Sequence, residues 1–187
     1  MQFVKSGPDI PDTLLHRHED GSVVFFCGAG ISYPAQLPGF HDLVQGIYAE
    51  LHASPDSIEE EATNKKQYDA TINLLEHRIP GGRFAVRSAL ARVLKPKLKK
   101  SGATAIHKAL LALARSRDGN SRLITTNFDR IFESVMSDRT RRIPTFSAPL
   151  LPIPKDSKWH GLVYLHGLLP KSPARQNRLQ PCWRLDG

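Results

Sequence analysis

A short apolar run that ends at two glycines is the feature that most constrains the fold of this chain. Residues 23–27 read VVFFC, and Gly28, Ala29 and Gly30 follow them directly. A brief run of β-branched and aromatic residues predicts a buried strand of a parallel sheet. Glycines at the end of such a strand can adopt positive φ and let a ligand approach the backbone closely. A tight turn without any ligand accounts for the same residues equally well.

Helical periodicity dominates the next ninety or so residues, where apolar side chains recur on one face of each segment. The expected helices are residues 40–51, residues 68–79, residues 83 to Pro96, and residues 104–116. In the last of these, Ile106, Leu110 and Leu113 are predicted to face the core. Residues 53–66 are acidic and polar, which indicates a loop or the frayed start of a helix.

Two further strands are predicted downstream. Residues 122–126 read RLITT, and a helix is expected within residues 127–136. Residues 137–158 are rich in proline and basic residues and are expected to form a loop, and residues 161–167, GLVYLHG, form the third strand. Strands separated by helical segments predict an α/β fold with a parallel sheet flanked by helices.

Polar residues follow the second and third predicted strands, at the sheet edge where α/β proteins bind ligands. Asn127 can orient a water or a ribose hydroxyl through its amide, with Thr126 and Asp129 beside it. These three residues can equally serve only to cap the next helix. His166 can act as a general base. His160 precedes its strand, so we expect it at the opposite edge.

The formal net charge of +8 and a pI near 9.7 raise the question of an anionic partner. Basic runs at residues 92–100 and 139–142 supply much of the excess. Such runs attract the phosphates of a nucleic acid or of a small nucleotide. Because no aromatic residues interleave with the basic ones, the sequence leaves nucleic-acid binding open without a clear motif for it.

No apolar run in the sequence reaches the roughly 20 residues that cross a bilayer, and the N-terminus lacks an apolar signal-peptide core. We therefore expect a cytoplasmic protein with no membrane partner. Cys27 and Cys182 are the only cysteines and form no CxxC pair, so neither a disulfide framework nor a structural metal site is expected.

Taken together, the motifs resemble the sirtuin (silent information regulator) family, in particular the bacterial sirtuin-like proteins that consume NAD in antiviral defence. GAGIS at 28–32 matches the family signature, and LPGF at 37–40 resembles its cofactor loop. TTNFD at 125–129 resembles the TQNID-type motif, and LHG at 165–167 carries the histidine of the family. The resemblance spans about residues 20–168 and rests on the combination of motifs, their order and their spacing.

The resemblance implies a Rossmann-like sheet and cleavage of the bond between nicotinamide and ribose, with NAD as the substrate. The residues it implies for NAD binding are Gly28, Ala29, Gly30, Ser32, Thr126 and Asp129, and the residues it implies for catalysis are Asn127 and His166. Because the transition state is oxocarbenium-like, such a site must position the ribose and exclude stray water.

Departures from the deacetylating sirtuins decide which reaction is expected. Those enzymes carry a four-cysteine zinc module after the histidine, whereas this chain has no CxxC, and Thr126 replaces the glutamine of their motif. We therefore expect hydrolysis of NAD to nicotinamide and ADP-ribose, without a metal. Protein deacylation and non-catalytic binding of NAD or ADP-ribose stay open as alternatives. A homo-oligomer, or an assembly with a sensor protein, is the quaternary state that the resemblance implies.

The expected organisation is an N-terminal extension over residues 1–22, an NAD-binding domain over 23–170, and an irregular tail over 171–187. In the family, further strands after the histidine close the adenosine side of the pocket. Because the residues after Gly167 do not resemble that half, we expect the domain to be truncated at its C-terminal side.

Overall fold

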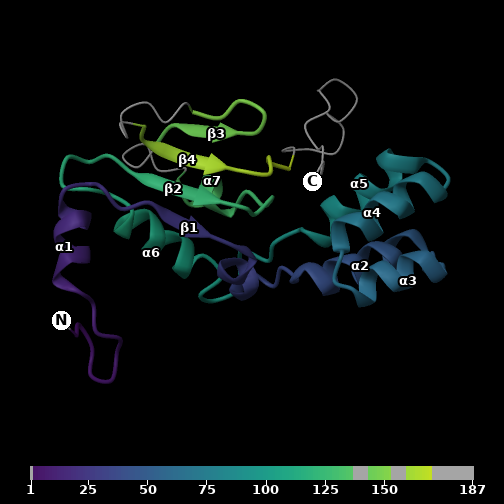
Figure 1. Cartoon of the computed structure of the whole chain (residues 1–187), viewed down its shortest axis with the longest axis horizontal. Helices are drawn as coiled ribbons and strands as arrows, with labels where there is room; N and C mark the ends of the chain where they lie inside the picture. The colour runs from purple at the N-terminus through teal and green to yellow at the C-terminus, as the bar shows by residue number, and fades with distance from the viewer. Residues whose placement is uncertain (1, 137–142, 153–158, 170–187) are drawn as a thin grey trace.

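A computed structural model describes residues 2–136, 143–152 and 159–169. It confirms an α/β fold in which helices flank a four-stranded parallel sheet of order β1-β2-β4-β3 (Figure 1). The strands are β1 (Phe25–Cys27), β2 (Arg122–Thr125), β3 (Thr145–Ser147) and β4 (Gly161–Tyr164). The helices are α1 (Asp12–Glu19), the 3-10 helix η1 (Ala29–Ala35), α2 (Phe40–Leu51), α3 (Ser57–Asn64), α4 (Tyr68–Arg78), α5 (Gly82–Val93), α6 (Ala105–Leu113) and α7 (Ile131–Val135).

The register of the sheet aligns the carboxyl ends of three strands. Cys27 of β1 pairs with Thr125 of β2, and Thr125 pairs with Tyr164 of β4. The segments that follow these strands therefore emerge side by side at one edge. In Figure 1 the helices α2 to α5 lie beyond this edge of the sheet.

One hydrophobic cluster lies between the sheet and the helices α6 and α7. Leu123, Leu162 and Tyr164 are fully buried there, and Phe132 of α7 packs among them. The crossovers from β1 to β2 and from β2 to β3 run in the same direction across the sheet. Crossovers between parallel strands are almost always right-handed, and two right-handed crossovers in one direction place their helices on the same face. The contact between α6 and α7 agrees with this rule.

A second hydrophobic cluster holds α2, α4 and α5 together as a helical module. Val44, Ile47, Leu75 and Val86 are almost completely buried in it. Ile131 of α7 also belongs to this cluster, whereas its neighbour Phe132 belongs to the cluster under the sheet. The short helix α7 thus connects the two hydrophobic clusters.

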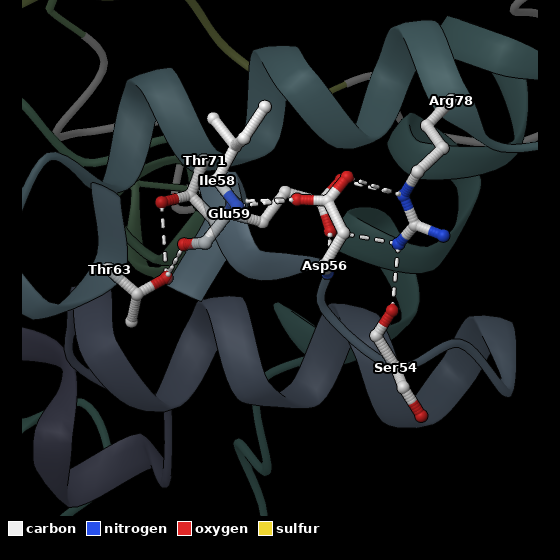
Figure 2. Close-up of polar contacts among 7 residues, drawn as sticks. All are labelled: Ser54, Asp56, Ile58, Glu59, Thr63, Thr71 and Arg78. Carbon is white, nitrogen blue, oxygen red and sulfur yellow. Dashed lines mark hydrogen bonds and ion pairs between the residues drawn. The ribbon is translucent and has the colours of Figure 1, made fainter. Parts of the chain in front are cut away.

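The prediction of a loop or a frayed helix start at residues 53–66 is wrong, because α3 begins with a complete capping box. The Asp56 carboxylate accepts hydrogen bonds from the amides of Ile58 and Glu59, and the Glu59 carboxylate accepts one from the Asp56 amide, at 2.8–2.9 Å. Figure 2 shows that Glu59, which is fully buried, also accepts hydrogen bonds from Arg78 of α4. This contact fixes α3 against α4.

Two other expectations need correction. The loop expected over residues 137–158 contains strand β3. Residues 137–142 and 153–158 lie outside the described residues, and so does the tail expected at 171–187. Helix α6 forms as expected but faces the core differently. Ile106 and Leu113 are 38% and 53% exposed, and His107 is buried instead.

None of the helices in the described ranges combines the length and the hydrophobicity that crossing a membrane requires.

Candidate functional site

A pocket of about 140 Å³ lies at the carboxyl edge of the sheet, between the segments that follow β1 and β2 and the helical module. Five of the eight predicted site residues line it. The lining residues are Ala29, Ser32, Leu37, Pro38, Phe40, Leu43, Leu94, Thr126, Asn127, Phe128 and Asp129. The structure therefore brings the GAGIS and TTNFD motifs, which are about 100 residues apart in the chain, into one site.

Ser32 is the centre of a buried hydrogen-bond cluster in this site. Its hydroxyl donates to the Asp129 carboxylate with an Oγ to Oδ2 distance of 2.8 Å. The same oxygen accepts a hydrogen bond from the Asn127 side-chain amide at 3.0 Å. Ser32, Asn127 and Asp129 are at most 8% exposed. These contacts hold three polar side chains from two separate motifs in one fixed arrangement.

The turn after β2 is shaped by two further hydrogen bonds. The backbone amide of Asn127 donates to the Thr125 hydroxyl at 3.1 Å. The Oδ1 atom of Asp129 accepts a hydrogen bond from the backbone amide of Ile131 at 3.0 Å. Asp129 therefore supports the start of α7 from a position just before the helix. The capping alternative expected Asp129 in the first turn, whereas Arg130 is the N-cap residue and the helix begins at Ile131. The other carboxylate oxygen of Asp129 bonds to Ser32, so the same side chain also belongs to the pocket.

The two glycines after β1 do not use positive φ, contrary to what was expected of them. Gly28 is extended, with φ −112°, and Gly30 is not among the residues with positive φ. A Cβ atom at Gly30 would meet nothing within 4 Å, and one at Gly28 would make only an ordinary contact with Thr126. Neither glycine lines the pocket. What they provide is open space beside the backbone, which a ligand can approach.

His166 lies at the predicted edge of the sheet but outside the pocket lining. It is exposed and follows the end of β4 by two residues, whereas His160 immediately precedes that strand. Strand polarity thus separates the two histidines as expected. The His166 ring is 6.3 Å from the ring of Phe128, which lines the pocket. His166 therefore lies next to the pocket without contributing to its wall.

His107 of α6 is a site residue that sequence reasoning missed. It is fully buried, and its Nε2 atom lies 3.5 Å from the Ser32 hydroxyl. Burial lowers the pKa of His107, an effect that the negative charge of Asp129 partly opposes. The sequence contains a signal for this face, because His107, Leu110 and Ala114 follow helical spacing. This face lies next to the predicted face of Ile106 and Leu113, and Leu110 belongs to both.

The helical module supplies an apolar wall opposite the polar cluster. Leu37 and Pro38 of the LPGF segment line the pocket together with Phe40, Leu43 and Leu94. Phe40 is 44% exposed and stacks on Tyr68 with a ring separation of 6.1 Å. A volume of about 140 Å³ is smaller than the roughly 300–1,000 Å³ of typical sites for drug-sized ligands. The pocket is therefore too small to enclose a whole drug-sized ligand.

Positive charge lies next to the pocket. The exposed lysines Lys95, Lys97, Lys99 and Lys100 directly follow Leu94, which lines the pocket. The Lys97 amide donates to the carbonyl oxygen of Ala35 at 2.9 Å, which attaches this basic segment to the end of η1. An anionic group outside the pocket would find a favourable potential here.

Comparisons with known proteins give one informative match. No protein-family model matches the chain, and no solved structure matches it significantly. Uncharacterized protein y4cA of Sinorhizobium fredii (strain NBRC 101917 / NGR234) is 34% identical over 173 residues, which cover 90% of this chain. The chain spans about 14% of the length of that relative. The similarity therefore concerns one segment of a much longer protein.

Proposed function

We propose that this chain binds NAD and hydrolyses it to nicotinamide and ADP-ribose, as a member of the sirtuin-like group that its motifs resemble. The observation that carries the proposal is the hydrogen-bonded cluster of Ser32, Asn127 and Asp129 on the wall of a small pocket. Polar groups held in fixed positions opposite an apolar wall suit the nicotinamide riboside end of NAD. The lysines that follow Leu94 complement its diphosphate.

The proposed reaction breaks the bond between nicotinamide N1 and ribose C1′ and forms a bond from a water oxygen to C1′. Nicotinamide leaves with the bond's electron pair, and the attacking water loses one proton. The ribose becomes oxocarbenium-like as the bond breaks, and the proposal assigns the stabilisation of that charge to the carboxylate of Asp129, which lines the pocket. The proposal gives Asn127 the role of orienting the water: Ser32 holds its side-chain nitrogen, and its side-chain oxygen would accept a hydrogen bond from the water.

His166 is proposed as the base that accepts the proton of the water or of a ribose hydroxyl. A general base contributes a factor of about 10²–10⁴ to a rate. The His166→Ala variant should therefore release nicotinamide at least about 100-fold more slowly than the unmodified protein. His160→Ala is the matched control, because His160 is also exposed but lies at the opposite end of β4. Chromatographic quantification of nicotinamide and ADP-ribose tests the proposal, and equal losses in both variants would contradict the assignment of His166.

Binding of NAD or ADP-ribose without cleavage is the second candidate function. It is favoured by one observation, namely that His166 is exposed and does not line the pocket. Calorimetric titration with NAD distinguishes the two candidates when product analysis accompanies it. Saturable binding with no nicotinamide release supports the second candidate, and release supports the first. Addition of an acetylated peptide to the same reaction tests protein deacylation, which requires O-acetyl-ADP-ribose as a product.

The resemblance extends the proposal to a role as an effector of antiphage defence, acting as a homo-oligomer or together with a sensor protein. NAD depletion would then stop growth of the infected cell. Phage plating on cells that carry the full-length gene, with and without Asn127→Ala, tests this role. We expect the variant to plate phage as efficiently as cells without the gene.

A further inference from the structure

A buried histidine lies behind the polar cluster, and the resemblance assigns it no role. His107 comes from α6, on the face that packs under the sheet, and its ring contacts the Phe132 ring edge-on at 4.7 Å. Its Nε2 atom faces the Ser32 hydroxyl at 3.5 Å. Its Nδ1 atom is buried and has no hydrogen-bond partner within the described part of the chain. The ring thus has one polar side and one apolar side.

The hydrogen bonds of Ser32 determine what His107 can do. A serine hydroxyl has one proton to donate and two lone pairs that can accept. The proton goes to Asp129, and one lone pair accepts from Asn127. Only the second lone pair is left for His107, so His107 must be the donor. That requires the neutral tautomer with the proton on Nε2.

The surroundings of the other ring nitrogen favour the same tautomer. A proton on Nδ1 would be a buried donor without an acceptor, which is costly in an apolar environment. An unprotonated Nδ1 leaves only an unused acceptor. The 3.5 Å separation between Nε2 and the Ser32 oxygen is long for a hydrogen bond. The contact therefore orients the hydroxyl rather than binding it strongly.

We propose that His107 is a positioning residue, which as the Nε2–H tautomer directs the Ser32 hydroxyl toward Asp129 and thereby keeps the Asn127 amide in its place on the pocket wall. The expected effect on catalysis rests on the proposed function. The tautomer of His107 and the placement of Ser32 and Asn127 do not depend on any ligand. With His107 absent, Ser32 can rotate, and Asn127 loses the acceptor that fixes its side chain. His107 itself touches no substrate.

Two variants separate positioning from simple packing. His107→Gln can place an amide N–H near the position of Nε2, whereas His107→Leu fills space without a donor. Because a small misplacement of a reacting group can cost about 100-fold in rate, we expect His107→Leu to lower kcat for NAD cleavage at least about tenfold with little change in KM. His107→Gln should keep most of the kcat of the unmodified protein. Equal kcat values for the Leu variant and the unmodified protein would overturn the proposal.

Nuclear magnetic resonance of the unliganded protein tests the structural part without any activity. The ¹⁵N chemical shifts of His107 should identify the Nε2–H tautomer at neutral pH. The side-chain amide resonance of Asn127 should move in His107→Leu and stay near its original position in His107→Gln. A proton on Nδ1, or an unmoved Asn127 resonance in the Leu variant, overturns the proposal. If the unmodified protein does not cleave NAD, the proposed function is contradicted but the positioning role of His107 is not. These spectra then test that role.

Discussion

At the scale of residues, Ser32 connects the two motifs of the site. It is 2% exposed and joins Asn127 and Asp129 by hydrogen bonds of 3.0 and 2.8 Å. A buried polar group left without its partner costs about 1–3 kcal/mol. This gives Ser32 a structural role as well as a place on the pocket wall, and the two roles predict different measurable effects.

We predict that Ser32→Ala lowers the free energy of unfolding by about 1–3 kcal/mol, because it leaves polar atoms of both Asn127 and Asp129 unpaired. Urea unfolding followed by circular dichroism measures this change. Ser134→Ala on α7 is a suitable comparison, because its hydroxyl donates to the Ile131 carbonyl within the same short helix and does not bond to Ser32, Asn127 or Asp129 in the cluster. An unfolding midpoint for Ser32→Ala equal to that of the unmodified protein would show that the cluster does not contribute to stability.

Particular residues show how far the sequence predicts the site. The polar residues at the strand ends were predictable, because strand polarity alone assigns Asn127, Asp129 and His166 to one edge of the sheet. His107 is not predictable from the periodicity of α6, because the helix has two overlapping apolar faces and the more hydrophobic one, with Ile106 and Leu113, is the one that stays partly exposed. The apolar wall depends on where the helical module packs, which no local pattern determines.

At the scale of elements, the start of α3 shows how local sequence and tertiary packing combine. Asp56 caps the helix, and Glu59 both completes the capping box and pairs with Arg78 of α4 (Figure 2). The acidic composition of residues 53–66 suggested a loop, because charge without apolar periodicity is typical of solvated segments. The motif of Asp followed three residues later by Glu was the signal for a helix start.

Removal of this cap should destabilise the helical module. Asp56→Ala is expected to lower the free energy of unfolding by about 1 kcal/mol, since two amides of the first turn lose their acceptor. Asp56→Asn keeps an acceptor oxygen and should lose less. Thermal unfolding of the two variants gives the comparison, and equal transition temperatures for both would argue against a capping role.

The Glu59 carboxylate should make stability depend on pH in the acid range. Burial raises its pKa, but the hydrogen bonds from Arg78 and from the Asp56 amide outweigh burial, and the net pKa is lowered. Because the folded-state pKa lies below the unfolded value of about 4.3, the carboxylate stabilises the fold above that pH. This stabilisation is lost as the pH falls through the folded-state pKa.

The corresponding measurement compares the unmodified protein with Glu59→Gln in urea at a series of pH values. The difference in unfolding free energy should be largest near pH 7 and should shrink as the pH falls below about 4.3. A difference that grows on acidification would mean that the Glu59 pKa is raised by burial rather than lowered by its partners.

At the scale of the whole molecule, α7 connects the sheet and the helical module. Ile131 packs into the helical cluster and Phe132 into the cluster under the sheet, and both are almost completely buried. The pocket lies where these two parts meet, so its polar and apolar walls depend on their relative position. The fold class followed from the alternation of strands and helices, whereas this connection required knowledge of tertiary contacts.

We predict that Ile131→Ala destabilises both parts together, by about 2–5 kcal/mol, because it opens a cavity where the clusters are joined. Hydrogen exchange should show faster exchange for amides of β2 as well as for those of α4. Val86→Ala, which removes a buried side chain of α5 within the helical cluster, serves as the comparison. Faster exchange confined to α4 in Ile131→Ala would show that the two parts unfold independently.

The central claim is that the pocket around Ser32, Asn127 and Asp129 cleaves NAD. The most direct test is the rate of nicotinamide release by the unmodified protein, by Asn127→Ala and by Asn73→Ala, whose asparagine is exposed on α4. We predict release by the unmodified protein and by Asn73→Ala at equal rates, and a loss of at least about 100-fold in Asn127→Ala. Equal release by all three proteins would contradict the claim.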